Sequence, residues 1–262
     1  MELNRVNLIY FSPTNTTQKT LRAIASVFDC EVREYDITTD RSIPVPEFGA
    51  GELVIAGVPV YGGRIPAITE EFFRSLQGTG AAAAAVGVYG NRHYDDAVLE
   101  LADLLKEDGF QFVAGGAFLA EHSFGTQIAT GRPDAQDLAK AREFGEKLLA
   151  KLKAANELSA VSEPEIPGNR PYKARGTAVN TAAPKTTDAC IKCGICVAAC
   201  PVGIIDAEDP SKITDVSKCQ KCYSCVKKCP VQAKYFDDEG VLKSKAFLEA
   251  NFSVRREPEM FL

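Results

Sequence analysis

The chain alternates between short apolar runs and longer segments with helical spacing. Strands that are apolar on both faces are typical of a parallel sheet covered by helices on each side. The segment EVREYDI (31–37) instead alternates apolar and charged residues, which predicts a strand at the edge of that sheet. The fully apolar runs are RVNLIYF (5–11), ELVIAGVPV (52–60), AAAAAVGVYG (81–90) and FVAGGAFLA (112–120).

Segments with an apolar period of about 3.6 residues separate these runs. In DDAVLELADLLKE, for example, Val98, Leu101, Leu104 and Leu105 fall on one helical face. The alternation predicts the α/β class, with a doubly wound five-stranded parallel sheet. The predicted helices span about 15–28, 66–77, 94–107 and 134–154.

Changes in composition divide the chain into four parts. Residues 1–155 are expected to form the α/β domain, and 156–185 are rich in Pro, Gly, Ser, Thr and Asn, as in an extended linker. Residues 186–235 hold the cysteine-rich domain, and 236–262 are expected to form a short helix and a terminal segment packed on one of the domains. Two states of the linker remain open: docking through Ile166, Pro171 and Tyr172, or swinging freely.

Composition narrows the class of protein. Of the 262 residues, 45% are hydrophobic and 25% are charged, as in globular proteins. No apolar run is long enough for a membrane span, and the N-terminal residues lack the pattern of a signal peptide. The net charge of −5 argues against nucleic acid or an anionic membrane as partner. These features predict a cytoplasmic protein.

Eight of the nine cysteines lie in two similar runs. The runs CIKCGICVAACP and CQKCYSCVKKCP begin at Cys190 and Cys219, and each reads C-x-x-C-x-x-C-x-x-x-C-P. This clustering points to metal rather than to disulfides. Cys30 lies far from both runs and is expected to be a small packed hydrophobe.

The spacing within the two runs predicts two [4Fe–4S] clusters. Three thiolates of a run hold one cluster, and the fourth cysteine reaches the cluster of the other run. The alternative is a pair of structural zinc sites, which need neither a third cysteine at this interval nor the proline. The expected ligand sets are Cys190, Cys193, Cys196 and Cys229 for the first cluster, and Cys219, Cys222, Cys225 and Cys200 for the second.

Hydroxyl and amide side chains gather where the first strand meets the first helix. In open α/β sheets this edge is where ligands bind, and free N–H groups at a helix N-terminus favour a phosphate. No nucleoside triphosphate or dinucleotide motif is present, and the turn contains no lysine or arginine. The alternative is an ordinary helix cap without a ligand. The candidate phosphate-binding residues are Ser12, Thr14, Asn15, Thr16 and Thr17.

Two further loops are expected on the same edge, after the third and fourth main strands. Their glycines allow close approach to a flat ring, and their tyrosines offer an aromatic face. Arg64 or Arg92 is a candidate for stabilising negative charge on a reduced flavin. The candidate ring-binding residues are Pro59, Val60, Tyr61, Gly62, Gly63 and Arg64 in one loop, and Tyr89, Gly90, Asn91, Arg92 and Tyr94 in the other.

Two histidines are candidates for proton donors. His93 lies in a predicted site loop, and His122 follows the last apolar run. Surface positions are expected for both.

Taken together, these segments resemble the fused flavodoxin–ferredoxin proteins of anaerobic bacteria and archaea. The resemblance rests on FSPTNTTQ, GVPVYGGRIP, VYGNRHYDDA, AEHSF, IPGNRPYK, the cysteine runs and EPEMFL. It implies a flavodoxin-like domain that binds FMN, followed by a small α+β ferredoxin domain of the bacterial type with two [4Fe–4S] clusters. Many relatives have glycine where this chain has Asn15, a residue that tolerates a left-handed backbone.

The resemblance implies a carrier that passes electrons among FMN, the two clusters and partner redox enzymes in anaerobic metabolism. Exchange within one chain and exchange across a homodimer are both open. The alternative is a flavoenzyme that reduces a small molecule at FMN, with the clusters as its electron wire. It requires a proton donor such as His93, His122 or Tyr94. A redox sensor is a third class, for which no partner domain is present in the sequence.

Overall fold

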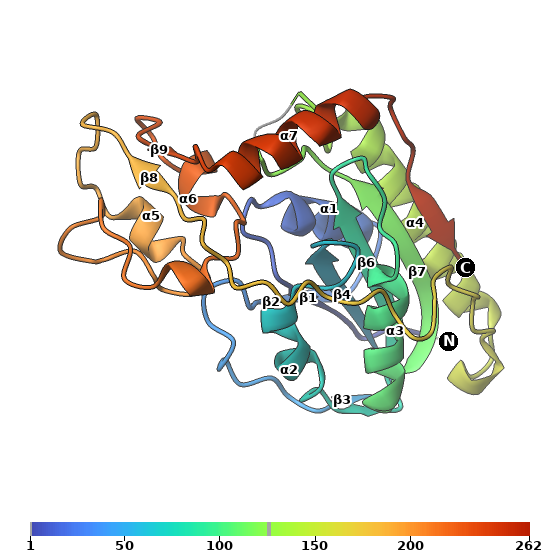
Figure 1. The fold of residues 1–262 in the computed structure, drawn as a ribbon. Coiled ribbons are helices and arrows are strands. Elements are labelled where there is room, and N and C mark those ends of the chain that lie inside the picture. Colours follow the sequence, from blue (N-terminus) through green and yellow to red (C-terminus); the bar gives the residue numbers. More distant parts are fainter. Residues whose placement is uncertain (1, 125–126) are drawn as a thin grey trace.

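A computed structural model describes residues 2–124 and 127–262. The N-terminal part is a three-layer α/β sandwich, and the cysteine-rich part lies beside it, as the orange segments of Figure 1 show. The central sheet has six strands in the order β10-β7-β6-β4-β1-β2. Its five N-terminal strands are all parallel. They are β1 (Arg5–Tyr10), β2 (Glu31–Asp36), β4 (Glu52–Pro59), β6 (Ala82–Tyr89) and β7 (Gln111–Leu119).

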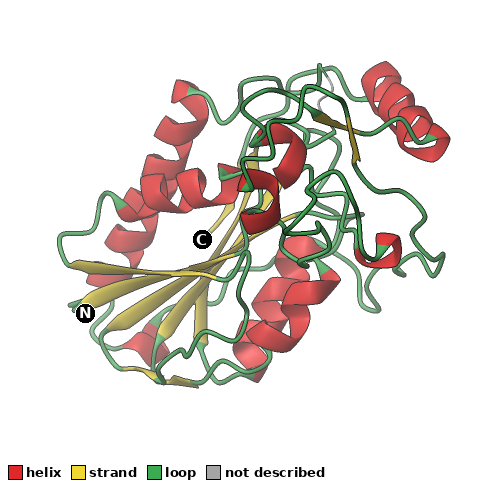
Figure 2. Ribbon diagram, turned by 90° about the vertical axis from the view of Figure 1, so that its left-hand side faces the viewer, coloured by secondary structure: helices red, strands yellow, loops and turns green. Residues whose placement is uncertain are grey.

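Four helical segments cover the two faces of this sheet, which Figure 2 shows fanned out between them. Helices α1 and α4 pack on one face, and α3 and the short α2 lie on the other. Strand β1 serves both faces because alternate side chains point in opposite directions: Leu8 packs under α1 and α4, and Ile9 packs under α3. The helices are α1 (Thr16–Ala25), α2 (Glu70–Phe73), α3 (Ala97–Glu107) and α4 (Ala135–Ala154).

The predicted elements agree with the structure except at one helix and one edge. The segment 66–77 forms only a 3-10 turn, η1 (Ala67–Thr69), and the single turn α2, and residues 74–77 then lead into the small strand β5 (Gly78–Thr79). Strand β5 pairs with β3 (Phe48–Gly49), apart from the main sheet. Edge strand β2 lies where its alternating pattern predicts.

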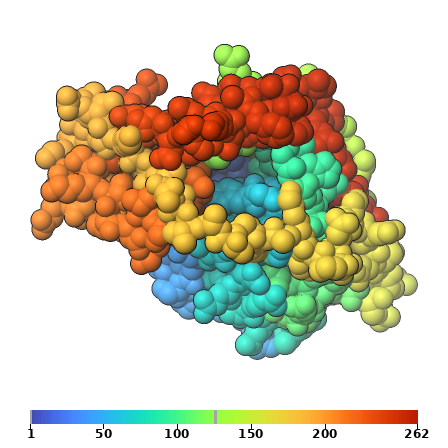
Figure 3. All heavy atoms as spheres, in the orientation of Figure 1, coloured from blue at the N-terminus to red at the C-terminus, as the bar shows by residue number. Residues whose placement is uncertain are grey.

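The C-terminal tail supplies a sixth strand. Strand β10 (Glu259–Phe261) pairs antiparallel with β7 and covers the edge that the five-stranded prediction leaves open. Before it, helix α7 (Glu239–Asn251) runs along the upper side of the molecule, shown in red in Figure 3. The tail thereby spans from the cysteine-rich part to the far edge of the sheet.

The cysteine-rich part is built from short elements. Its termini are joined by a two-stranded antiparallel sheet of β8 (Lys185–Thr186) and β9 (Lys234–Tyr235). Each cysteine run contains one short helix, α5 (Ile195–Ala198) or α6 (Ser224–Lys227). A 3-10 turn, η3 (Val216–Lys218), precedes the second run.

The linker between the two parts is extended but firmly attached. Apart from the 3-10 turn η2 (Leu158–Ala160), it has no helix or strand before Lys185 among the described residues. It crosses the front of the molecule as the yellow segment of Figure 3. Ile166 is only 8% exposed and belongs to the core of the α/β domain. This agrees with the docked state and not with free swinging.

Three acidic side chains of α3 and its N-cap hold the linker. Asp96, Glu100 and Asp103 are spaced by about one helical turn and are all buried. Asp96 accepts hydrogen bonds from the backbone N–H groups of Asn169 (2.8 Å) and Lys173 (2.6 Å).

The other two acids bind arginines of the linker. Glu100 accepts a hydrogen bond from Arg175 at 2.8 Å. Asp103 accepts one from Nε of Arg170 at 2.8 Å and one from Nη2 of Arg170 at 2.6 Å. Buried charges of this kind require their partners. The linker therefore follows one defined path over α3.

Within residues 2–124 and 127–262, no helix has the length and apolar character of a membrane span.

Candidate functional site

Hydrogen bonds of Ser12 fix the conformation of the turn after β1. The Ser12 hydroxyl accepts a hydrogen bond from the Gln18 N–H (3.1 Å), and the Ser12 N–H donates to the hydroxyl of Thr38 (2.8 Å). Asn15 has φ +62°, the left-handed conformation that its side chain tolerates. Ser12 therefore caps the helix, and Asn15 shapes the turn through its backbone.

Other hydroxyl and N–H groups of this turn lie together without a protein acceptor. Thr17 is only 1% exposed, and its hydroxyl has no hydrogen-bond partner among the described residues. The N–H groups of Thr16 and Thr17 belong to the first turn of α1, where no intrahelical acceptor exists. The hydroxyls of Thr14 and Thr16 lie 3.3 Å apart at the same place. A phosphate accepts from all of these donors, so the turn fits the phosphate of FMN.

A pocket, here called the edge pocket, opens beside this turn. It lies at the carboxyl ends of four parallel strands, where ligands of open α/β sheets bind. Strand β1 lies between β2 and β4 in the sheet, so the chain reverses its direction of winding there. The pocket is lined by Pro13, Thr14, Thr16, Thr17, Pro59, Val60, Tyr61, Val88, Tyr89, Gly90, Ala120, Glu121, His122, Ser123 and Cys222.

The edge pocket brings together many of the predicted site residues. Members of the phosphate turn and of both ring-binding loops meet there, although they come from three different strand ends. Tyr89 is 2% exposed, and its hydroxyl has no partner among the described residues. The predicted residues that line the pocket are Thr14, Thr16, Thr17, Pro59, Val60, Tyr61, Tyr89 and Gly90.

The structure places other predicted residues of the first ring-binding loop away from the pocket lining. Arg64 donates to both carboxylate oxygens of Glu100, each at 2.6 Å, and is therefore committed to a buried ion pair. Gly62 and Gly63 have φ of +62° and +90° and turn the chain back toward α3. A Cβ at Gly63 would lie 2.1 Å from a carboxylate oxygen of Asp95, so only glycine fits there.

The second loop ends in contacts to the C-terminal tail. Asn91 donates to the carbonyl oxygens of Phe252 and Val254, both at 2.7 Å. The Tyr94 hydroxyl donates to Glu259 at 2.7 Å. Arg92 pairs with Asp95. In the structure these three predicted flavin contacts instead fix the tail and the base of α3.

The two histidines occupy different environments. His93 stacks on Tyr94 with its side chain 41% exposed, close to its expected surface position. His122 is partly buried rather than fully at the surface, and its ring lines the edge pocket. Burial, with the nearby charges of Lys227 and Arg92, lowers the pKa of His122 to about 4. Its Nδ1 accepts from the Phe124 N–H at 3.3 Å, so the neutral ring carries its proton on Nε2.

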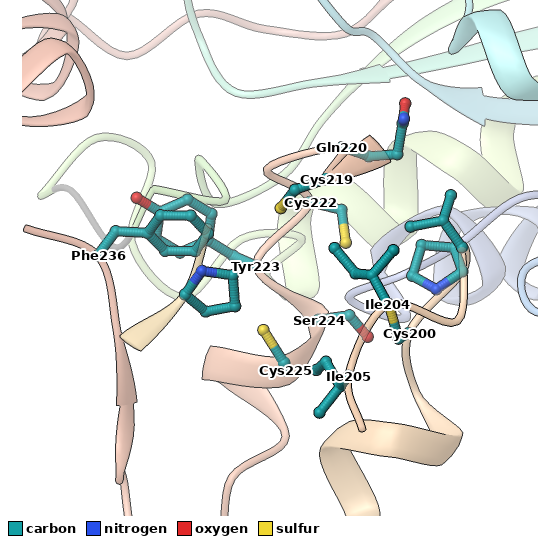
Figure 4. A pocket seen from close by; sticks show the side chains of 13 residues that line it. Cys200, Ile204, Ile205, Cys219, Gln220, Cys222, Tyr223, Ser224, Cys225 and Phe236 are labelled. Atoms are coloured by element: carbon teal, nitrogen blue, oxygen red, sulfur yellow. The ribbon is translucent and has the colours of Figure 1, made fainter. Parts of the chain in front are cut away.

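Four cysteines from both runs surround a second cavity, here called the cysteine cavity. Cys200, Cys219, Cys222 and Cys225 line it, and Figure 4 shows their side chains among those of Ile204 and Ile205. The set is the one that crossed ligation predicts, with Cys200 contributed by the other run. Its remaining lining residues are Pro184, Pro201, Val202, Gln220, Tyr223, Ser224 and Phe236.

The thiols of this cavity are shielded from solvent to different degrees. Cys222 and Cys225 are 8% and 7% exposed, and Cys200 and Cys219 are partly buried. The donor set of four thiols in an apolar shell fits an iron–sulfur cluster, whose potential depends on the solvent around it.

Three members of the other predicted ligand set, Cys190, Cys193 and Cys196, precede or belong to α5, and Cys229 follows α6. Cys196 is 7% exposed. Cys193 is exposed. The Cys229 sulfur accepts a hydrogen bond from the Ala233 N–H at 3.2 Å.

The cysteine-rich part differs from a site that holds a single metal ion. Within residues 2–124 and 127–262, no three His, Cys, Asp or Glu side chains are grouped as ligands of one metal ion. The cysteines that line the cysteine cavity are spread around it instead. Cys30 packs partly buried beside the core, apart from both runs.

The binding residues predicted from the sequence leave out two contributions to the edge pocket. The segment 120–123 follows β7, so the rule that ligands bind at carboxyl ends of strands extends to it, but only His122 of this segment is predicted, as a candidate proton donor. Cys222 also lines the pocket, and no local sequence signal connects it to a turn more than 200 residues earlier.

One part of the chain matches a known protein family. Residues 189–233 match the family described as 4Fe-4S dicluster domain. No curated protein matches the chain.

Similar solved structures include a flavodoxin from the domain Archaea, 18% identical, covering 57% of this chain and 99% of its own, with a TM-score of 0.44. Flavodoxin 1 from Bacillus cereus is 22% identical over 56% of this chain and 98% of its own, with a TM-score of 0.42. An apo NADH:FMN oxidoreductase is 15% identical over 61% and 95%, also with a TM-score of 0.42.

The strand order of the sheet, rather than these scores, identifies the first fold. Without the small strands and β10, the order is second, first, third, fourth, fifth, which is the flavodoxin-like arrangement. The chain thus joins an α/β domain with the flavodoxin-like strand order to a segment, residues 189–233, that matches the family of 4Fe-4S dicluster domains.

Proposed function

We propose that this protein is an electron carrier that holds FMN in the edge pocket and two [4Fe–4S] clusters at its cysteine runs. The observation that carries the proposal is the edge pocket itself, because it joins an unpartnered buried hydroxyl of Thr17 to two loops that frame a flat ring. The cysteine cavity beside it supports the second half of the proposal. Redox proteins are the proposed donor and acceptor, in anaerobic metabolism.

The phosphate of FMN is assigned to the turn after β1. The hydroxyls of Thr14, Thr16 and Thr17 and the first N–H groups of α1 donate to it, and the positive end of the helix dipole favours its charge. Ser12 and Asn15 hold the turn in shape.

The flavin ring is assigned to the space between Tyr61 and Gly90. A Cβ at Gly90 would lie 2.6 Å from the imidazole ring of His122 and 2.9 Å from its Cα. A residue with a side chain would therefore collide with His122 at this wall of the pocket. Bound FMN supplies the capacity to accept or give up one or two electrons. The protein contributes position and hydrogen bonds, including the Nε2–H of His122.

The clusters are assigned by cavity and by spacing. Cys200, Cys219, Cys222 and Cys225 hold one, which the shared cavity supports. Cys190, Cys193, Cys196 and Cys229 hold the other, on the repeat of the spacing. The grouping of eight cysteines in two metal-type runs, rather than in disulfides, fits a reducing compartment such as the cytoplasm.

A flavoenzyme is the second candidate, because His122, Glu121 and Ser123 line the edge pocket. Of the three proton donors considered for such an enzyme, only His122 lies there. With a pKa of about 4 its ring is neutral near pH 7, so it donates a hydrogen bond but holds no imidazolium proton to transfer. Stopped-flow oxidation by small molecules distinguishes the two: fast turnover of a metabolite supports the enzyme, and fast exchange only with redox proteins supports the carrier.

The first test is cofactor content. Protein purified without oxygen is denatured, the released flavin is identified, and iron and sulfide are assayed. We expect about one FMN and about eight iron atoms per chain, as two four-iron clusters require. Iron without FMN would contradict the assignment of the edge pocket, and zinc in place of iron would contradict that of the cysteine runs.

A further inference from the structure

One cysteine lies at both cavities. Cys222 lines the cysteine cavity together with three other thiols, and it also lines the edge pocket opposite the phosphate turn. It is 8% exposed, so little solvent separates the two cavities at this point. A ligand of the proposed cluster thereby forms part of the wall of the proposed flavin site.

Tyr61 lies next to this shared wall. Its ring lines the edge pocket and meets Phe11 edge to face, with centroids 6.4 Å apart. Cys222 lines the same pocket. The ring therefore lies at the β4 strand end, in a pocket that a residue of the second cysteine run helps to form.

Polar contacts fix the two domains to each other at this wall. The Ser224 hydroxyl, fully buried between two cysteines of the run, donates to the carbonyl oxygen of Pro13 at 2.8 Å. Arg41 donates to the carbonyl oxygen of Pro201 at 2.9 Å. Lys227 forms an ion pair with Glu121, which itself lines the edge pocket.

Aromatic rings extend the contact on the other side of Cys222. Phe124 packs on Tyr223 with centroids 5.2 Å apart, and Tyr223 stacks on Phe236 at 4.5 Å. Val241 of α7 closes this cluster. With the linker held on α3 as well, the cysteine-rich part is attached to the α/β domain from three directions.

We propose that electrons pass directly within one chain, between the flavin site and the cluster held by Cys200, Cys219, Cys222 and Cys225, across the wall that Cys222 forms. This inference rests on the proposed function and goes beyond it by assigning the route. With both cofactors held by these residues, each transfer would move one electron: the cluster would be oxidised and the flavin reduced, or the reverse, and no bond would form or break. A partner redox protein would supply or accept the balancing electron through the cluster that Cys190, Cys193, Cys196 and Cys229 would hold.

The test measures electron exchange in the intact protein with both cofactors bound. A laser flash reduces the flavin through a photosensitiser, and absorbance follows the exchange between flavin and cluster. We expect a first-order rate that stays constant when the protein is diluted tenfold. A rate that falls in proportion to concentration would show exchange between chains and overturn the inference, while the proposed function stands. Protein that lacks FMN or iron would instead contradict the proposed function.

A double variant tests the wall itself. Ser224→Ala with Lys227→Ala removes two contacts across the interface and leaves all eight run cysteines in place. We expect normal FMN and iron content, a lower rate because the interface is held less closely, and weaker relaxation of the flavin EPR signal by the reduced cluster. The matched control, Ser217→Ala with Lys212→Ala, removes a hydrogen bond and an ion pair within the cysteine-rich part only. Equal rates in both double variants would overturn the inference.

Discussion

The hydroxyl of Ser224 donates a hydrogen bond to the carbonyl oxygen of Pro13, 2.8 Å away, although 211 residues separate them in the chain. Ser224 lies within the second cysteine run, and Pro13 lies within the turn that is assigned to phosphate. This one buried contact joins the two regions for which cofactors are proposed. It makes the binding of one cofactor relevant to the geometry of the other.

Thr17→Val is expected to weaken FMN binding without destabilising the cofactor-free protein. The buried hydroxyl has no partner among the described residues, so its loss costs the flavin-free fold nothing, whereas a charge-assisted hydrogen bond to phosphate is worth about 1.5–3 kcal/mol. Flavin titration is expected to show affinity lower by roughly 10- to 100-fold. The control is Thr20→Val, on the same helix, whose hydroxyl bonds the Thr16 carbonyl oxygen. Equal affinity in the two variants would remove Thr17 from the site.

Cys200→Ala is expected to share its phenotype with Cys219→Ala rather than with Cys196→Ala from its own run. Cys200 lines the cavity of the second run, so both variants lose the same cluster and roughly half of the iron. EPR spectra of the reduced proteins distinguish which cluster remains. Cys30→Ser is the control and keeps all iron. A spectrum of Cys200→Ala that matches Cys196→Ala would contradict crossed ligation.

His122 is expected to stay neutral well below pH 6.5. NMR of protein with labelled histidine follows the ring, and His93→Gln assigns the signals. Because the folded pKa of about 4 lies below the unfolded value of about 6.5, acid favours the unfolded state: this contribution to stability is complete above pH 6.5 and decreases as pH falls toward 4.

The same shift predicts a difference in stability. Between pH 7.5 and 5, the free energy of unfolding is expected to fall by about 2 kcal/mol more in the native protein than in His122→Gln. A His122 signal that titrates near pH 6.5, or equal losses in the two proteins, would contradict the burial of this ring.

Glu100→Gln is expected to destabilise the fold by about 3–5 kcal/mol, because it leaves the buried guanidinium of Arg64 and that of Arg175 without their shared charge. Unfolding by urea, followed by circular dichroism, measures the change. Limited proteolysis is expected to cut the released linker first. Glu107→Gln is the control, since its pair with Arg74 is exposed and worth less than about 1 kcal/mol. A loss as small as that of the control would show that the linker is held by other contacts.

The sequence predicts those features of the fold that depend on local pattern. Ile9 and Leu8 alternate in a run that is apolar on both faces, and this is enough to place β1 in the centre of a parallel sheet. The left-handed Asn15 agrees with the resemblance, because many relatives have glycine there and asparagine tolerates the same backbone. Cys200 joins the second set because the spacing of the runs is specific to crossed ligation.

The sequence does not predict contacts between segments that are distant in the chain. Arg64 lies in a glycine-rich loop and is predicted as a flavin contact, but in the structure its guanidinium pairs with Glu100 of α3. The sequence of α3 gives no local sign that arginines of the linker cover its acidic side chains. Strand β10, of three residues, is too short to show a period of two. Such partners are chosen by tertiary structure and leave no local signature.

Because Cys222 lines both cavities, oxygen is expected to affect the retention of both proposed cofactors together. Iron lost from the cysteine cavity frees a side chain that also forms the wall of the edge pocket. Damage to the iron centre is then expected to release flavin as well, so the yellow colour of a preparation reports on the condition of its iron. Air would inactivate this protein as one unit, and repair would have to begin with the metal.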